Sequence, residues 1–208
     1  MTAEALAAAK QAVRAERLKV RDAMAEEERR AASLKLVDHV EALRVVPGST
    51  VSAFLPIRSE IDLRPLIAEL RRRYGVTIGL PIILKTGGLF FRAHDEGDEL
   101  VPLGFGTFGP GENKPVVVPD LILAPLSAFD RTGARIGYGK GHYDQTIARL
   151  RREGHAPRVV GVAFACQEVD VVPAEPHDVP LEAVLTEDGL IATGGGATGI
   201  GVTDGAAS

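Results

Sequence analysis

The sequence predicts an α/β fold, with a mainly parallel sheet covered on both faces by helices and with two further helices before it. Apolar segments of strand length alternate along the chain with segments of helical periodicity. Apolar residues make up 45% of the 208 residues and charged residues 25%, as in ordinary soluble globular proteins. A chain of this length can bury a core without disulfides or a structural metal.

Two helices are expected at the N-terminus, over residues 3–24 and 26–43. In the first, four cations recur at steps of four, three and four and therefore share one face. They are Lys10, Arg14, Arg17 and Arg21. This spacing alone is compatible with a solvated basic stripe and with an anion site.

The remaining elements follow from alternating apolar runs and turn signals. Strands are expected at 50–55, 76–83, 89–92, 121–124, 158–164 and, as the last strand, 183–186. Asp62 can cap a helix that Gly75 ends. A second helix of this part is expected at 141–152. Residues 94–119, rich in Gly, Pro and charge, are expected to be a long excursion with only short strand pieces, and loops of this length are often functional.

The composition indicates how the chain is divided into domains and argues against several classes of partner. Residues 1–192 are expected to form a single domain and residues 193–208 a disordered Gly-rich tail. The net charge of −4 argues against a general nucleic-acid binder. Cys166 is the only cysteine, so no intramolecular disulfide can form, and a cytoplasmic location is expected. No apolar run is long enough for a membrane helix, and Lys10 interrupts any signal-peptide core.

The densest chemical signal lies between Asp130 and Asp144. Gly137, Gly139 and Gly141 alternate there, after a strand and before a helix. Glycines let backbone amides turn toward one point, and a helix N-terminus adds positive partial charge, so the segment predicts a phosphate cradle. It is neither a Walker A loop, because Gly141 replaces the Ser or Thr, nor a G-x-G-x-x-G motif. The alternative is a plain glycine-rich turn, which the accompanying Arg135 and Lys140 disfavour.

Three carboxylates are candidates for binding. Asp144 lies one turn into the helix, where a carboxylate beside phosphates favours Mg²⁺; alternatively it only stabilises the helix dipole. Asp178, in a proline-bracketed loop, is the second candidate ligand, although the sequence alone does not locate it. Glu60 follows a buried strand and can hold amino groups of a substrate, unless it is an exposed loop acid.

Residues 124–130 and 135–144 closely resemble the signature of the 5-formyltetrahydrofolate cyclo-ligase, or 5,10-methenyltetrahydrofolate synthetase, family. Three further segments fit this family in order: 10–14, 54–60 and 177–187. The resemblance spans about residues 5 to 190. It implies a three-layer α/β/α fold and an enzyme that converts ATP and 5-formyltetrahydrofolate into ADP, phosphate and 5,10-methenyltetrahydrofolate, with Mg²⁺, through a phosphorylated formyl group. We expect a monomer, with no nucleic-acid or membrane partner.

The resemblance also implies roles for individual residues. Those expected at ATP are Lys10, Arg14, Arg135, Ile136, Gly137, Tyr138, Gly139, Lys140, Gly141, His142 and Tyr143. Those expected at the folate are Leu55, Glu60, Tyr138, Gly139, Lys140, Gly141 and His142. Arg135 and Lys140 are expected to be catalytic, and Asp144 and Asp178 to hold the metal.

The chain departs from the family pattern at three positions. His142 replaces a usual Tyr, Gly109 a frequent Glu, and Glu182 a frequent Asp. His142 is closest to the chemistry, so it is expected to affect folate affinity or pH response. Two other functions remain open: a non-catalytic nucleotide or folate sensor on the same fold, and an enzyme like sugar-phosphate isomerases or CoA-transferases that binds phosphate without ATP hydrolysis.

Overall fold

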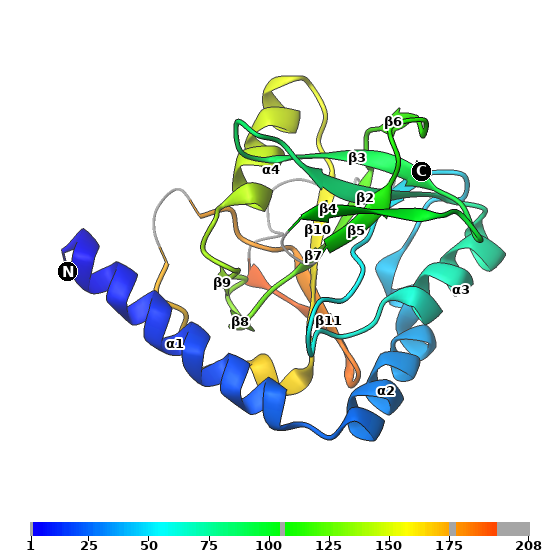
Figure 1. Ribbon diagram of the computed structural model, residues 1–208. Helices are drawn as coiled ribbons and strands as arrows, with labels where there is room; N and C mark the ends of the chain where they lie inside the picture. The colour runs from blue at the N-terminus through cyan, green and yellow to red at the C-terminus, as the bar shows by residue number, and fades with distance from the viewer. Residues whose placement is uncertain (1, 105–106, 175–177, 195–208) are drawn as a thin grey trace, which may run out of the picture.

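A computed structural model describes residues 2–104, 107–174 and 178–194 (Figure 1). Within these residues, the main sheet consists of β1 (Thr50–Ser52), β2 (Thr77–Ile83), β3 (Leu89–His94), β6 (Val116–Val117), β7 (Leu121–Pro125), β10 (Arg158–Val162), β11 (Ala183–Thr186) and β12 (Gly189–Ala192). Their order is β12-β11-β10-β7-β1-β2-β3-β6. The five strands from β11 to β2 run parallel, and β12, β3 and β6 pair antiparallel at the two sides. The predicted mainly parallel sheet is therefore confirmed.

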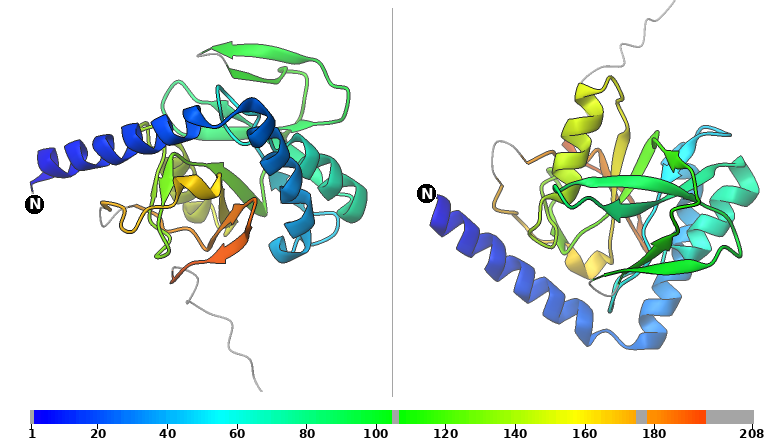
Figure 2. Two further views of the ribbon diagram at one scale, coloured as in Figure 1. Left: turned by 90° about the horizontal axis from the view of Figure 1, so that it is seen from below. Right: turned by 45° about the horizontal axis from the view of Figure 1, so that its top comes forward.

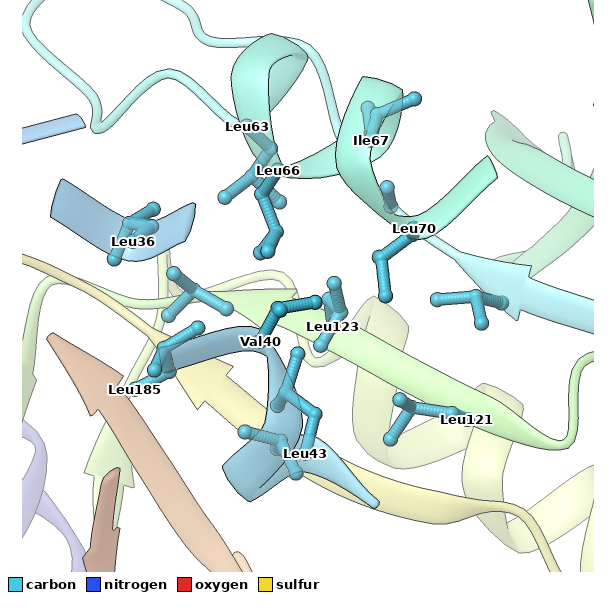
Figure 3. Packing of buried hydrophobic residues seen from close by; sticks show 14 of the residues in the cluster. Leu36, Val40, Leu43, Leu63, Leu66, Ile67, Leu70, Leu121, Leu123 and Leu185 are labelled. Atoms are coloured by element: carbon cyan, nitrogen blue, oxygen red, sulfur yellow. The ribbon is translucent and has the colours of Figure 1, made fainter. Parts of the chain in front are cut away.

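Helices cover both faces of this sheet, which confirms the three-layer α/β/α prediction. One face carries α2 (Glu26–Lys35), the 3₁₀-helix η1 (Leu36–Leu43) and α3 (Arg64–Tyr74), and the other carries α4 (His142–Arg152) (Figure 1). Leucines of η1 and α3 pack on Leu121 and Leu123 of β7 (Figure 3). Ile122, between them, points to the opposite face and packs with Ile147 and Leu150 of α4.

Helix α1 (Ala3–Ala23) lies outside these layers, beside β8 (Ala128–Phe129) and the 3₁₀-helix η2 (Ala165–Gln167) (Figure 2). Of its residues, all of which the structure describes, Arg21 alone is buried. No helix in the described parts of the chain has both the length and the apolar character needed to cross a bilayer.

The observed elements differ from the predicted ones in several places. The second N-terminal helix tightens after Lys35 into η1, which aims Leu36, Val40 and Leu43 into the core. The excursion over 94–119 contains a hairpin of β4 (Leu100–Gly104) and β5 (Thr107–Pro110). β8 pairs with β9 (Arg135–Ile136), a short hairpin that the sequence did not indicate.

The prediction that residues 183–186 form the last strand is wrong. β12 follows β11 directly and pairs with it as an antiparallel hairpin. The signal was Asp188-Gly189, a dipeptide typical of tight hairpin turns, and Gly189 has a φ of +136° that favours glycine. Thr193, the first residue of the predicted tail, is buried and its hydroxyl donates to the Leu181 carbonyl. Residues 195–208 of that tail lie outside the described residues.

Asp130 fixes the chain segment that leads into the glycine motif. The side chain is 2% exposed. Its Oδ1 accepts hydrogen bonds from the Thr132 amide (2.8 Å), the Thr132 hydroxyl (2.6 Å) and the Ala134 amide (3.3 Å). Its Oδ2 accepts from the Val172 amide at 2.8 Å. The carboxylate therefore closes the β8–β9 turn and ties it to the Val172 segment.

Replacement of Asp130 by Asn should destabilise this region. The Asn carbonyl can keep the contacts of Oδ1, but its NH₂ group would face the Val172 amide, so two donors meet in a buried place. We expect Asp130→Asn to lower the free energy of unfolding by about 2–4 kcal/mol. The measurement is denaturant unfolding, with Asp120→Asn as the control, because exposed Asp120 also accepts a backbone hydrogen bond, from Thr50. Equal losses in the two variants would contradict the anchoring role of Asp130.

Candidate functional site

A cavity of about 1280 Å³ lies where the chain leaves β1 and β7. Its walls come from α1, the loop after β1, α3, the β4–β5 hairpin and the glycine segment at the start of α4. The candidate site residues of the sequence analysis all line it. They are Lys10, Arg14, Leu55, Glu60, Arg135, Ile136, Gly137, Tyr138, Gly139, Lys140, Gly141, His142, Tyr143, Asp144 and Asp178. The fold thus gathers in one place residues that are up to 168 positions apart in the chain.

The basic face of α1 points toward the protein body. Lys10 Nζ donates to Asp178 Oδ2 at 2.7 Å, and Arg14 Nε donates to the Gly137 carbonyl at 2.7 Å. One turn further on, Arg17 NH1 donates to the Cys166 carbonyl at 3.2 Å. Arg21 is buried. The face is therefore not a solvated stripe, and two of its cations, Lys10 and Arg14, reach the cavity.

The glycine segment turns sharply at the cavity wall. Gly139 and Gly141 have φ values of +85° and +64°, in the left-handed region that favours glycine. A Cβ on Gly139 would lie 3.3 Å from Arg14 NH2, so a larger side chain here would also crowd that guanidinium. Gly141 is the N-cap residue of α4, so the positive end of the helix dipole lies at the cavity. The exposed Lys140 adds a full positive charge. These are the features of an anion-binding site.

Two carboxylates are held by cations at the same end of the cavity. Arg135 NH2 donates to Asp144 Oδ1 at 2.6 Å, and NH1 of the same guanidinium donates to the Val179 carbonyl. Because Val179 follows Asp178, Arg135 brings the two acidic residues to the same region. Asp178 itself pairs with Lys10.

The donor set is compatible with Mg²⁺. No group of three or more His, Cys, Asp or Glu side chains placed to bind a metal occurs among the described residues. Magnesium does not require one, because it commonly binds one or two carboxylates together with phosphate oxygens and water. The oxygen ligands of Asp144 and Asp178, beside an anion-binding segment, fit that pattern.

Glu60 is held in a fixed position rather than exposed on a loop. Its Oε2 accepts a hydrogen bond from the Ile57 amide at 2.9 Å, and its Oε1 accepts from the Tyr138 hydroxyl at 2.5 Å. Burial raises the pKa of the Glu60 carboxyl above its usual value, against the lowering effect of the Tyr138 and Ile57 hydrogen bonds and the Arg21 and Arg58 charges. The site therefore provides a desolvated carboxyl group in a fixed orientation.

The three departures from the family pattern lie in different environments. His142 lines the cavity, and its Nδ1 is buried without a hydrogen-bond partner in the described parts of the chain. Gly109 lies in β5, where a Cβ would come within 2.5 Å of Leu103 Cδ1. Glu182 pairs with Arg158 at 3.2 Å. Only His142 therefore lies in the cavity wall.

Sequence reasoning missed two parts of this region. It placed Arg21 on the basic face of α1 but did not predict its contact with Ser59, in the loop after β1. It also did not predict that Phe108 of the β4–β5 hairpin would line the cavity. The length of the excursion over 94–119 was the sequence signal that could have indicated a hairpin. For Arg21, the sequence offered only its position in the series of cations on α1.

A sequence model of the 5-formyltetrahydrofolate cyclo-ligase family matches residues 6–187. A 5-formyltetrahydrofolate cyclo-ligase of Escherichia coli K12 is 36% identical over 148 residues, which are 68% of this chain and 80% of the relative. The protein of the same name from Mycolicibacterium smegmatis is 33% identical over 168 residues, 71% of this chain and 78% of the relative.

Solved structures agree with these relatives. The NMR structure of Aquifex aeolicus 5,10-methenyltetrahydrofolate synthetase is 28% identical and superposes with a TM-score of 0.71, covering 88% of this chain and 92% of that chain. The 5,10-methenyltetrahydrofolate synthetase of Mycoplasma pneumoniae, at 22% identity, has a TM-score of 0.68 and covers 86% of this chain and 98% of that chain. The latter likeness shows the fold alone.

The raised pKa of Glu60 predicts how stability depends on pH. A carboxyl group whose pKa is higher in the folded than in the unfolded chain contributes stability below the unfolded pKa, near 4.5, and loses it as pH rises through the folded pKa. The unfolding free energy of the wild type minus that of Glu60→Gln should therefore fall as pH rises from below about 4.5, and then level off.

The control is Glu69→Gln, measured by denaturant unfolding over the same pH series. Hydrogen bonds from Arg72 and Arg73 lower the pKa of Glu69 to about 2, so its contribution has the opposite sign and is lost as pH falls toward that value. A Glu60 difference that is flat across this range, or that rises with pH, would show that the carboxyl group is not desolvated.

Proposed function

The chain belongs to the 5-formyltetrahydrofolate cyclo-ligase family, and we propose that it catalyses the ATP-dependent cyclisation of 5-formyltetrahydrofolate to 5,10-methenyltetrahydrofolate, releasing ADP and phosphate. The observation that carries this proposal is one continuous cavity with two chemically different ends. We call the part of the wall formed by Lys10, Arg14, the glycine segment and the N-terminus of α4 the cationic end, and the part formed by Leu55, Ile57 and Glu60 the other end. Its volume exceeds the roughly 300–1,000 Å³ of a pocket for one small ligand, which supports the binding of two substrates.

The chemistry explains why both ends are needed. A formamide oxygen is a poor leaving group. Phosphoryl transfer from ATP to this oxygen, with ADP leaving, converts it into a phosphate ester of an imidate. N10 of the folate then attacks the activated carbon, the C–O bond breaks, phosphate leaves with the electron pair, and N10 loses its proton to solvent. Such a reaction depends on positioning the two substrates and neutralising phosphate charge.

The cationic end provides that neutralisation in our proposal. Lys10, Arg14 and the segment from Arg135 to Tyr143 bind the triphosphate, with Arg135 and Lys140 as the catalytic cations. The nearly buried Arg135, whose side chain is 8% exposed, keeps a fixed direction through Asp144 and the Val179 carbonyl. Preorganised charge of this kind needs no rearrangement as phosphoryl charge develops.

We further propose Mg²⁺ as the cofactor, held by Asp144 and Asp178. When bound, the ion would neutralise phosphate charge and polarise the transferred phosphoryl group. Lys10 and Arg135 pair with these carboxylates in the present structure. When the carboxylates bind the ion, phosphate oxygens can replace them as partners of the two cations.

The other end of the cavity is proposed to bind the folate. Glu60 accepts hydrogen bonds from amino groups of the pterin, and Leu55 packs on its ring. Tyr138 to His142 line both ends, so they contact both substrates. Location in the cytoplasm and the monomeric state remain predictions.

The decisive experiment mixes the purified protein with ATP, Mg²⁺ and 5-formyltetrahydrofolate and follows the absorbance of the methenyl product together with ADP release. Equal yields of product and ADP are expected. Tight binding of either ligand without turnover would favour the sensor alternative. ATP-independent reaction with another phosphorylated substrate would favour the isomerase-like or transferase-like alternative.

Lys140→Ala should lower kcat by about two orders of magnitude, because the phosphoryl group loses a charge partner in the transition state. Binding of the folate in the absence of ATP should weaken much less than kcat falls, because Lys140 is only one of several residues proposed to contact the folate. The measurements are steady-state kinetics and folate titration. Lys19→Ala is the control, since exposed Lys19 lies on α1 outside the cavity lining. A Lys140→Ala rate close to that of Lys19→Ala would exclude Lys140 from the ATP site.

Asp144→Asn should shift the Mg²⁺ dependence of the rate to much higher concentration. The Asn oxygen can still accept from Arg135, so the fold should survive, but the charge that attracts the cation is lost. If Asp144 only stabilises the helix dipole, its loss costs about 0.3–1 kcal/mol and leaves the Mg²⁺ curve unchanged.

Rate against Mg²⁺ concentration, with thermal melts, separates these cases. Asp38→Asn is the control, because Asp38 is also an acid in a first helical turn but is exposed and outside the cavity lining. Superimposable Mg²⁺ curves for wild type and Asp144→Asn would refute the metal assignment.

A further inference from the structure

Arg21 is a buried cation behind the wall of the candidate site. Its side chain is 1% exposed, and it is not part of the cavity lining. Burying a guanidinium is costly unless hydrogen bonds and charges compensate for the lost water. Its contacts therefore indicate what this residue does.

The guanidinium contacts two separate segments at once. Nε donates to the Ser59 hydroxyl at 3.0 Å, and NH1 donates to the Tyr138 hydroxyl at 3.2 Å. Ser59 in turn donates to Asp22, the neighbour of Arg21 in α1. Asp22 Oδ1 lies 3.8 Å from Arg21 Nε and supplies the nearest opposite charge.

Both contacts lead to Glu60. Ser59 precedes it in the chain, within a loop in which Arg58 has a left-handed φ of +55°, unusual for a residue other than glycine. Tyr138, which receives the hydrogen bond from Arg21, donates its own proton to Glu60 Oε1 at 2.5 Å. The backbone and the carboxylate of Glu60 are thus both held by partners of Arg21.

We propose that Arg21 is a positioning residue for the folate: its guanidinium holds Ser59 and Tyr138 together and so keeps the Glu60 carboxylate aimed into the cavity. This inference rests on the proposed function, in which Glu60 receives the pterin. Arg21 does not touch the substrate. Apart from its charge, which lowers the pKa of Glu60, it acts through these two partners.

The proposal requires an arginine for a geometric reason. Nε and NH1 belong to one rigid planar group, so they fix Ser59 and Tyr138 relative to each other. A lysine keeps the positive charge but has a single nitrogen on a flexible stem and cannot maintain both contacts in the same geometry. Arg21→Lys therefore removes the bridge and retains the charge.

The chain offers a matched control on the same helix face. Arg17 lies one turn earlier, and its NH1 donates to the Cys166 carbonyl at 3.2 Å, so it also attaches α1 to the body. It contacts neither the Glu60 loop nor the glycine segment in the contacts of the described residues, and it does not line the cavity. The Arg17→Lys variant therefore measures how KM and kcat change when α1 is less firmly attached but Arg21 keeps its contacts with Ser59 and Tyr138.

The experiment measures KM for 5-formyltetrahydrofolate, KM for ATP and kcat in both variants. Arg21→Lys should raise the folate KM about tenfold or more, the effect expected from loss of a charged hydrogen bond, while the ATP KM stays within about twofold of wild type. Arg17→Lys should leave both KM values near wild type. Equal changes in the folate KM in the two variants, or parallel changes in both KM values for Arg21→Lys, would overturn the positioning role.

A double-mutant cycle tests the route through Tyr138. If Arg21 acts through this hydroxyl, Arg21→Lys should raise the folate KM much less in a Tyr138→Phe background than in the wild type. Fully additive effects would contradict the proposal. If Arg21→Lys does not fold, Ser59→Ala replaces it, since it removes the other contact of the bridge; it should raise the folate KM severalfold with no change in the ATP KM. An unchanged folate KM in Ser59→Ala would then overturn the inference.

These outcomes are distinct from failure of the proposed function. If the wild-type protein itself forms no methenyl product, the reaction is not the one proposed. If the wild type turns over and the folate KM does not respond to Arg21, the reaction stands and only the positioning role fails.

Discussion

Helix α1 is attached to the rest of the molecule through the cations on one of its faces, and the cavity depends on that attachment. Successive turns contribute Lys10, Arg14, Arg17 and Arg21, each with a hydrogen-bond acceptor on another segment. Arg14 and Arg21, seven residues apart, contact the neighbouring residues Gly137 and Tyr138. The helix therefore sets the position of the glycine segment, which forms one end of the cavity and, through Tyr138, supports the other.

Two cations of the proposed nucleotide end, Arg135 and Lys10, are paired with carboxylates. Asp144 orients Arg135, and Asp178 orients Lys10. Each pair keeps a cation near the cavity without leaving an uncompensated charge in a partly buried place. In the proposed function, the same arrangement would give an incoming polyphosphate two cations that are already in position and two carboxylates able to bind a divalent ion. In the proposed function, binding and catalysis would thus use groups whose geometry the fold has already established.

The sequence predicted the parallel core well because buried parallel strands are short, nearly continuous apolar runs, as at 121–124 and 158–164. It failed for β12, which is only partly buried and follows a two-residue turn of Glu187 and Asp188. For 94–119 it indicated short strand pieces but not that β4 and β5 pair as a hairpin, because their residues mix exposed, half-buried and buried positions without a regular apolar pattern. The glycine segment at 135–144 was predictable because its glycines, cations and carboxylate are nearly consecutive, whereas the roles expected for Lys10, Arg14, Glu60 and Asp178 came from the family resemblance. The bridge made by Arg21 was not predictable, since it joins positions 21, 59 and 138, and no local pattern specifies such a contact.

Because polar contacts attach α1, we expect this helix to open locally at a lower free energy than the sheet and the helices packed on it. The apolar clusters on either face of the sheet are built from the other helices and the strands, whereas α1 adds only partly buried Val13 to a small cluster with Ala128, Ile136 and Val172. Local opening of α1 thus exposes little apolar surface and leaves the sheet and its helices intact. We therefore expect a smaller free energy to protect the amides of α1 from hydrogen exchange than protects those of β7 or β10. Because salt screens the partly exposed ion pair between Lys10 and Asp178, added salt should loosen the cavity wall before it affects the core.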